Sequence, residues 1–319
     1  DPDHSISEVN GKGESILHIA AINGHLDIVQ KCFEWDFDFN TRTKHGATPL
    51  MLAVQNNKLS VVQYILVPPV KFKLDRFSAQ DAAFLLVKSL ENVNENLLYA
   101  RKIKSNGTDV YDTESTGIAS NMVDLLLQQS LPVTGKTMSN GITPLHAAAS
   151  AGKLEAFKAF HKAKGDLDAF DYAEQKPLHK ACTSNLSIVR LILGIEAGAG
   201  ILVADSKRAP MLLASDKYGK ECRILSALHG RWKIHVFCNE VIAENKEAVY
   251  NFNKTADDSA IEWTDEDFIL VLKLIETENE DCLSYLMTRG FNLNTKQVDT
   301  NLTLPMFACK IGSVKMINF

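Results

Sequence analysis

The sequence lacks long apolar runs, paired cysteines and a strong excess of charge of either sign. Its longest apolar stretches are AAFLLV at 82–87 and FILVLKLI at 268–275, whereas a membrane span needs about 20 such residues. The net charge is −5, which gives no reason to expect nucleic acid as a partner. No two of the six cysteines form a CxxC pair, so neither a disulfide framework nor a zinc module is expected. We therefore expect a protein of the reducing cytoplasm that does not insert into membranes.

Signatures of catalysis and of cofactor binding are also missing. No Ser/His/Asp, Cys/His or paired-carboxylate arrangement stands out in the chain. The triplet GKT at 135–137 looks like the end of a phosphate-binding loop, but Ser130 stands where such a loop requires its first glycine. We expect no enzymatic activity, no cofactor and no bound metal.

The sequence contains instead a phrase that recurs. Pro-Leu-His occurs at 144–146 and again at 177–179, so that His146 and His179 are 33 residues apart. An earlier pair of anchors, His18 and Met51, has the same spacing. Weaker copies of the phrase have their anchors at Leu212, Leu272 and Met306. A fixed period of this length is the mark of a repeat protein.

Each copy carries its own helix signals. Thr48-Pro49 and Thr143-Pro144 combine a hydroxyl cap with a proline at the first helical turn. Six residues after five of the anchors stands glycine or asparagine, the two residues that tolerate a left-handed helix end; they are Gly24, Asn57, Gly152, Asn185 and Gly312. A second apolar helix follows each of these positions, and then a polar, turn-rich link leads to the next copy. The predicted repeat is helix, tight turn, helix and projecting turn, which makes the chain all-α.

Small residues mark the interior of the first helices. A neighbouring repeat can approach closely at Ala20-Ala21 and at the three alanines 147–149, because their side chains are small. Cys182 and Cys309 occupy the position of Ala21, so we interpret both as packing residues rather than reactive thiols.

These features resemble ankyrin repeats, whose pattern is G-x-TPLH-x-AA-x-x-G followed by a second helix rich in leucine and valine. The resemblance implies a solenoid in which the histidines bond to neighbouring backbone and to the threonine of their own TPLH. It departs at Ile16 in place of proline, at Lys176 in place of threonine, and at Leu304-Pro305, where the motif is scrambled.

The predicted repeats carry two insertions and follow an N-terminal lead-in at 1–11. Their bounds are 12–44, 45–77, 78–139 with an insertion at 91–119, 140–172, 173–205, 206–265 with an insertion at 228–257, 266–299 and a truncated repeat at 300–319. The first insertion is polar and is predicted to form a surface loop with a helical turn around Leu97 to Ile103. In the second, the alternation of Trp232, Ile234 and Val236 is compatible with a strand or with a helix.

An open solenoid offers a long groove and evenly spaced turns rather than an enclosed pocket, and the family resemblance implies a binding scaffold. We therefore expect a protein-protein interaction scaffold that binds a protein or an extended peptide, as a monomeric array within a longer chain. The alternatives are the cytoplasmic array of an ion channel or of a multidomain signalling enzyme, or an enzyme whose site lies in the second insertion. The candidate contact residues lie at the projecting turns: Arg42, Lys44, His45, Met138, Ser139, Asn140, Asp171, Tyr172, Glu174, Lys207 and Arg208. A basic-aromatic cluster in the second insertion is a further candidate, for an acidic partner or a lipid headgroup: His229, Arg231, Trp232, Lys233 and His235.

Overall fold

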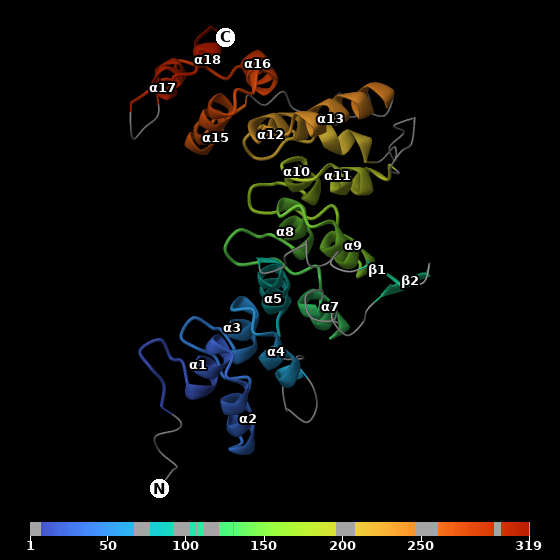
Figure 1. The fold of residues 1–319 in the computed structure, drawn as a ribbon, viewed down its shortest axis with the longest axis vertical. Helices are drawn as coiled ribbons and strands as arrows, with labels where there is room; N and C mark the ends of the chain where they lie inside the picture. The colour runs from blue at the N-terminus through green and yellow to red at the C-terminus, as the bar shows by residue number, and fades with distance from the viewer. Residues whose placement is uncertain are drawn as a thin grey trace. The chain divides into compact units, whose positions relative to one another are not determined.

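The computed structural model is almost entirely helical (Figure 1). It describes residues 8–66, 77–91, 102–105, 108–111, 121–129, 131–195, 208–245, 261–296 and 301–318. The chain divides into two compact bodies: the first holds residues 1–139 and 158–165, and the second holds 140–157 and 166–319.

The first body is built on a row of first helices. Its helices are α1 (Ile16–Asn23), α2 (Leu26–Glu34), α3 (Pro49–Gln55), α4 (Leu59–Leu66), α5 (Ala79–Glu91) and α7 (Asn121–Gln128). Helix α3 contacts α1 on one side and α5 on the other, while α2 packs against α4 and α5 against α7. This is the arrangement expected of stacked helix pairs.

The second body continues the same pattern. It contains α8 (Pro144–Ser150), the start of α9 (Leu154–Lys162), α10 (Pro177–Cys182), α11 (Leu186–Leu193), the 3₁₀ helix η2 (Ala209–Leu213), α12 (Cys222–Leu228), α13 (Trp232–Glu244), α15 (Asp265–Glu276), α16 (Glu280–Thr288), α17 (Leu304–Ile311) and α18 (Val314–Asn318). Helices α8, α10, α12, α15 and α17 contact one another in that order, and each is followed by a second helix. The all-α repeat architecture is confirmed.

At several first helices a side chain caps the exposed backbone amides. Thr48 Oγ1 accepts from the Met51 N–H at 3.3 Å. At α15 the capping is reciprocal: Asp267 Oδ2 accepts from the Thr264 N–H at 2.7 Å, and Thr264 Oγ1 accepts from the Asp267 N–H at 3.4 Å. Ser78 and Asp81 form the same pair at α5. Aspartate thus replaces histidine at the fourth position of two repeats.

Close packing of the first helices rests on small side chains. Ala21, Ala53, Ala148 and Ala181 are completely buried. Cys182 is completely buried as well, and so are Cys222 and Cys238. Burial raises the pKa of the Cys182 and Cys222 thiols, which keeps them protonated and unreactive.

The packing interpretation is confirmed for Cys182 but not for Cys309, which is exposed. Cys309 lies on α17, in the last repeat that the structure describes.

Four of the five predicted left-handed helix ends are confirmed, with φ of 81° at Gly24, 54° at Asn57, 70° at Gly152 and 76° at Gly312. The prediction is wrong for Asn185, whose φ is −137°. Its side chain caps the next helix instead, accepting from the Ser187 N–H at 2.8 Å. An asparagine at this position can therefore serve the following helix rather than end the preceding one.

The sixth repeat differs most from the prediction. Leu212, expected as an anchor inside a first helix, lies in the 3₁₀ helix η2. The first helix is α12, and the segment that follows it is the regular helix α13, so the strand interpretation of Trp232, Ile234 and Val236 is wrong. The predicted insertion at 228–257 thus begins with the second helix of a repeat, while residues 246–257 lie outside the described residues.

The first insertion contains a short hairpin. Strands β1 (Lys102–Ser105) and β2 (Thr108–Tyr111) pair antiparallel, with Ile103 opposite Val110. Ile103 is therefore in a strand and not in the predicted helical turn; Leu97 lies outside the described residues. Within the described part of the chain, no helix has both the length and the apolar character that crossing a membrane requires.

The left-handed helix end gives a direct test of stability. A Cβ added at Gly152 would make only ordinary van der Waals contacts, the nearest at 3.6 Å, so no clash opposes a larger residue at the Cβ. We expect Gly152→Val to lower the free energy of unfolding by at least ~1 kcal/mol, because a β-branched residue resists a positive φ. Urea unfolding followed by circular dichroism measures the change.

Gly152→Asn is the matched control, because asparagine tolerates this conformation and should cost clearly less. Equal losses for the two variants would show that bulk rather than backbone conformation decides the effect.

Candidate functional site

The projecting turns share a side-chain clamp. In the link before α10, Asp171 Oδ1 accepts from the N–H groups of Ala173 at 2.8 Å and Gln175 at 2.9 Å. Asp216 Oδ1 accepts from Tyr218 and Lys220 in the same way, both at 2.9 Å. Each clamp closes a loop that places a left-handed residue at its fourth position, Glu174 in one and Gly219 in the other.

The first body has the same clamp with other residues. Asn10 Oδ1 accepts from the N–H groups of Lys12 at 2.9 Å and Glu14 at 3.0 Å. Thr43 Oγ1 accepts from the Ala47 N–H at 3.2 Å. The clamping residues were not predicted from the sequence, although each of them stands three residues before a left-handed position.

Consecutive turns are joined by backbone hydrogen bonds. The Lys44 N–H donates to the Lys12 carbonyl at 3.0 Å in the first body. In the second body three such bonds join successive turns. The Tyr172 N–H donates to the Asn140 carbonyl at 3.0 Å, the Lys217 N–H to the Ala173 carbonyl at 3.1 Å, and the Glu262 N–H to the Tyr218 carbonyl at 2.9 Å. Within each body the turns therefore hold one another at a fixed spacing.

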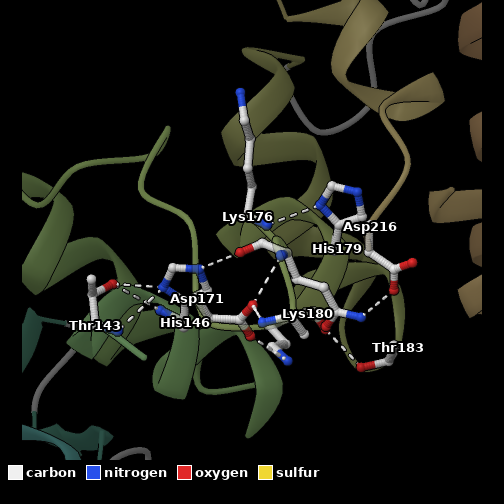
Figure 2. Close-up of polar contacts among 10 residues, drawn as sticks. Thr143, His146, Asp171, Lys176, His179, Lys180, Thr183 and Asp216 are labelled. Atoms are coloured by element: carbon white, nitrogen blue, oxygen red, sulfur yellow. Dashed lines mark hydrogen bonds and ion pairs between the residues drawn. The ribbon is translucent and has the colours of Figure 1, made fainter. Parts of the chain in front are cut away.

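The repeated histidines lie beneath these turns and connect them to the helices (Figure 2). His146 Nδ1 accepts from the Thr143 N–H at 3.3 Å, so its Nε2–H donates to the Gln175 carbonyl at 2.9 Å. His179 Nδ1 accepts from Lys176 N–H at 3.0 Å, and its Nε2 bonds to the Ala214 carbonyl at 2.8 Å. The neutral imidazole supplies both the acceptor and the donor that this arrangement needs.

His18 forms the equivalent bonds, to Ser15 Oγ at 2.8 Å and to the Thr41 carbonyl at 3.2 Å. Burial lowers the pKa of His18 and of His179, against the opposing effect of their bonds to carbonyl groups. The structural interpretation of the three histidines is confirmed. Among the described residues, no group of three or more His, Cys, Asp or Glu side chains is placed to hold a metal ion.

Of the predicted contact residues in the first body, Arg42 is committed to an internal ion pair. Its two nitrogens reach both carboxylate oxygens of Asp81, at 3.1 and 2.9 Å. Burial acts to raise the pKa of Asp81, but hydrogen bonds from Arg42 and Ser78 outweigh it and lower the pKa. Lys44 and His45 are exposed, and Lys44 Nζ donates to the Gly11 carbonyl at 2.9 Å.

The residues predicted around the fourth repeat are exposed. Met138 is 75% exposed, and Ser139 and Asn140 are exposed beside it in the chain. Met138 stands 33 residues before Asp171, so it occupies a clamp position with a side chain that has no oxygen. The glycine of the nearby GKT triplet has a packing role: a Cβ at Gly135 would lie 1.8 Å from the Ala79 carbonyl oxygen.

In the fifth repeat the three predicted residues have different environments. Asp171 is buried at 6% exposure, and its second oxygen pairs with Lys180 Nζ at 2.9 Å (Figure 2). Tyr172 is 58% exposed, and its ring lies against Gly141, where a Cβ would come within 2.5 Å of it. Glu174 is exposed. The buried clamp thus holds Tyr172 and Glu174 outward while offering no surface of its own.

Of the last two predicted contact residues, Lys207 and Arg208, the structure describes only Arg208. Arg208 Nη1 donates to the Ile192 carbonyl at 2.6 Å, which ties it to the end of α11. Lys207 lies outside the described residues.

In the basic-aromatic cluster of the second insertion, His229, Arg231 and Lys233 are exposed and Trp232 is half-buried, whereas His235 is internal. His235 is 2% exposed and lies between the rings of Trp232 and Tyr285, whose centroids are 4.6 and 4.2 Å from its own. Its Nδ1 lies 3.1 Å from the Arg223 carbonyl and its Nε2 3.0 Å from Asn239 Nδ2. Burial and the Arg223 charge lower the pKa of His235, although the carbonyl bond opposes this. This side chain packs α13 against α16 and presents no surface to a partner.

Two comparisons with known proteins agree with this geometry. A family model described as ankyrin repeats, three copies, matches residues 2–75 and 115–205, together just over half of the chain. The chain is 39% identical over 67 residues to the mouse and to the rat protein named ankyrin repeat and SAM domain-containing protein 6. In both cases the match covers 21% of this chain and 8% of the relative.

The clamp can be tested by removing its oxygens. We expect Asp171→Ala to lower the free energy of unfolding by about 1–3 kcal/mol, because two backbone N–H groups and Lys180 lose their partner. Asp171→Asn keeps an oxygen for the two amides and should cost less. Urea denaturation of both variants gives the comparison; equal losses would show that only the charge matters.

The buried histidines predict a pH dependence. Burial lowers the folded-state pKa values of His18, His179 and His235 below the ordinary imidazole value of about 6.5. The unfolded chain therefore takes up protons first as the pH falls below about 6.5, and the free energy of unfolding should decrease from there toward the lowered pKa values. His179→Asn, which retains an acceptor for the Lys176 N–H, should show a shallower decrease between pH 7.5 and 5 in urea titrations. An unchanged slope would contradict the assignment.

Proposed function

This chain belongs to the ankyrin-repeat family, and on that premise we propose that it is a protein-protein interaction scaffold that captures a protein or extended peptide partner without catalysis of its own. Ankyrin repeats generally mediate protein-protein interaction. The observation that carries the proposal for this chain is the set of backbone bonds between successive turns. A surface whose spacing is fixed before binding loses little conformational entropy when a partner docks.

The side chains available to a partner are fewer than the sequence suggests. Arg42, Asp171 and Arg208 make contacts within the chain: Arg42 pairs with Asp81, Asp171 accepts from the amides of its own turn, and Arg208 donates to the Ile192 carbonyl. Exposed positions remain at the turns of both bodies: Lys44, His45, Met138, Ser139, Asn140, Tyr172 and Glu174. We propose that these residues contact the partner, each within its own body.

Tyr172 is the strongest single candidate. Tyrosine is enriched among residues that dominate binding energy. Its ring is supported by Gly141 and its backbone N–H is bonded to Asn140, yet more than half of the residue is exposed. A rigid aromatic side chain of this kind can contribute contact area at low entropic cost. The proposal places the array in the cytoplasm, as a monomer within a longer chain.

The experiment compares two exposed aromatic residues. We expect Tyr172→Ala to weaken partner capture by about tenfold or more, as for a central contact residue, with the melting curve unchanged. Trp35→Ala is the control, because Trp35 is 51% exposed but follows α2 rather than forming part of a turn. Quantitative affinity capture with the wild type and both variants gives the ratio.

Capture that survives Tyr172→Ala combined with Glu174→Lys would contradict the proposed surface. An equal loss with Trp35→Ala would contradict it as well, because the turns would then have no special role.

A further inference from the structure

The exposed face of helices α1 and α3 carries apolar side chains. On α1, Ile16, Ile19 and Asn23 are exposed at intervals of three and four residues, so they lie along one face of the helix. Ile16 is 37% and Ile19 42% exposed. Leu52, 33 residues after Ile19, is half-buried at the same position of the adjacent helix α3. These side chains form an apolar stripe over α1 and α3.

At the carboxyl ends of α1 and α3 the stripe ends at the side-chain amides of Asn23 and Asn56, which occupy equivalent positions. Asn23 Nδ2 donates to the Ile19 carbonyl at 2.9 Å, and Asn56 Nδ2 donates to the Leu52 carbonyl at 2.8 Å. These bonds hold both amides along their helices. The corresponding positions in α8 and α10 hold Ala147 and Lys180 in place of the apolar pair, so those two helices do not repeat the stripe.

Lysines stand at both ends of the stripe. At the turns, the Lys44 ammonium bonds to the neutral Gly11 carbonyl, which leaves its charge uncompensated, and Lys12 is exposed in the neighbouring turn. At the other end the Lys58 stem lies over Gly24, where its Cδ would be 2.8 Å from an added Cβ. None of the three lysines forms an ion pair with a described residue.

Few negative charges oppose these lysines. Glu14 is the one acidic residue of the two turns at 10–14 and 42–46, and its carboxylate accepts from Asn10 Nδ2 at 2.7 Å. The Arg42 charge is neutralised by Asp81. The stripe is thus apolar in the middle and carries an excess of positive charge at its ends.

We propose that this stripe binds a peptide segment whose apolar side chains are flanked by acidic residues. Apolar groups on Ile19 and Leu52 would be removed from water, while carboxylates would lie near the lysines at either end. The inference rests on the proposed scaffold function and specifies the chemistry of the partner in the first body.

The test uses a fluorescein-labelled peptide of eleven residues with two central leucines and glutamates on both sides. Anisotropy titration of the full chain should show saturable binding that weakens as salt rises from 50 to 500 mM, because salt screens the lysines. The Lys12→Glu/Lys44→Glu double variant should bind about tenfold more weakly. Lys296→Glu, an exposed lysine of the second body, makes the same kind of change elsewhere and should have no effect.

The apolar part is tested separately. Ile19→Ser should also weaken binding about tenfold, and circular dichroism should remain that of the wild type because Ile19 is an exposed residue. Polyglutamate of the same length should bind at least tenfold more weakly than the leucine peptide, and a peptide with lysines in place of the glutamates should not bind.

The inference is overturned if the leucine peptide fails to bind, if polyglutamate binds equally well, or if the double variant binds like the wild type. It is also overturned if the wild type dimerises and Ile19→Ser abolishes the dimer, because a second copy would then cover the stripe. Loss of peptide binding with retained sensitivity of partner capture to Tyr172→Ala contradicts this inference alone. Failure of both measurements contradicts the scaffold proposal as well.

Discussion

A helix pair of this size can bury its apolar side only against another pair, and this requirement governs the rest of the structure. Alanines and cysteines on the first helices permit the approach, and Ala21, Ala148 and Ala181 are fully buried as a result. The approach also buries polar groups, which must find partners. The neutral imidazoles of His146 and His179 meet this need by joining their own helix start to the link that follows.

The same requirement explains the substitutions at that position. In α5 and α15 an aspartate stands where the histidine would be and bonds back to its own cap, Ser78 or Thr264. It fixes the helix start but cannot reach the next link as the imidazole does. In the second body a different pair, Lys220 with Asp267 at 2.6 Å, joins α15 to the turn at 216–220, which precedes α12. Contact between repeats is thus retained although the residue that makes it changes.

The repeat and the role of the histidines could be predicted because both depend on local signals. The sixth repeat was predicted, but its first helix was placed around Leu212 instead of at α12, because Glu221 and Ile224 replace the threonine and histidine of the motif. A backbone signal was nevertheless present: Gly219 and Gly230 are 11 residues apart, as are Gly141 and Gly152. All four have a positive φ, so the spacing of left-handed positions marks a repeat even where its side chains have changed.

The contact residues were harder to predict, because exposure depends on groups that are distant in the sequence. Arg42 is exposed, as its place in the turn suggests, but its guanidinium is already paired with Asp81, 39 residues later. The Asp171 carboxylate is directed inward by amides of its own turn and by Lys180. The exposure that the turn position suggested was retained by Lys44, His45, Met138, Ser139, Asn140, Tyr172 and Glu174.

The three thiols of Cys182, Cys222 and Cys238 lie on three different helices, α10, α12 and α13, and none is accessible in the packed molecule. A reagent that modifies cysteine can reach them only when those helices separate. The rate of their alkylation therefore measures how often the fifth and sixth repeats open, and this measurement requires no bound partner. Cys309, which is always accessible, provides the reference rate within the same chain.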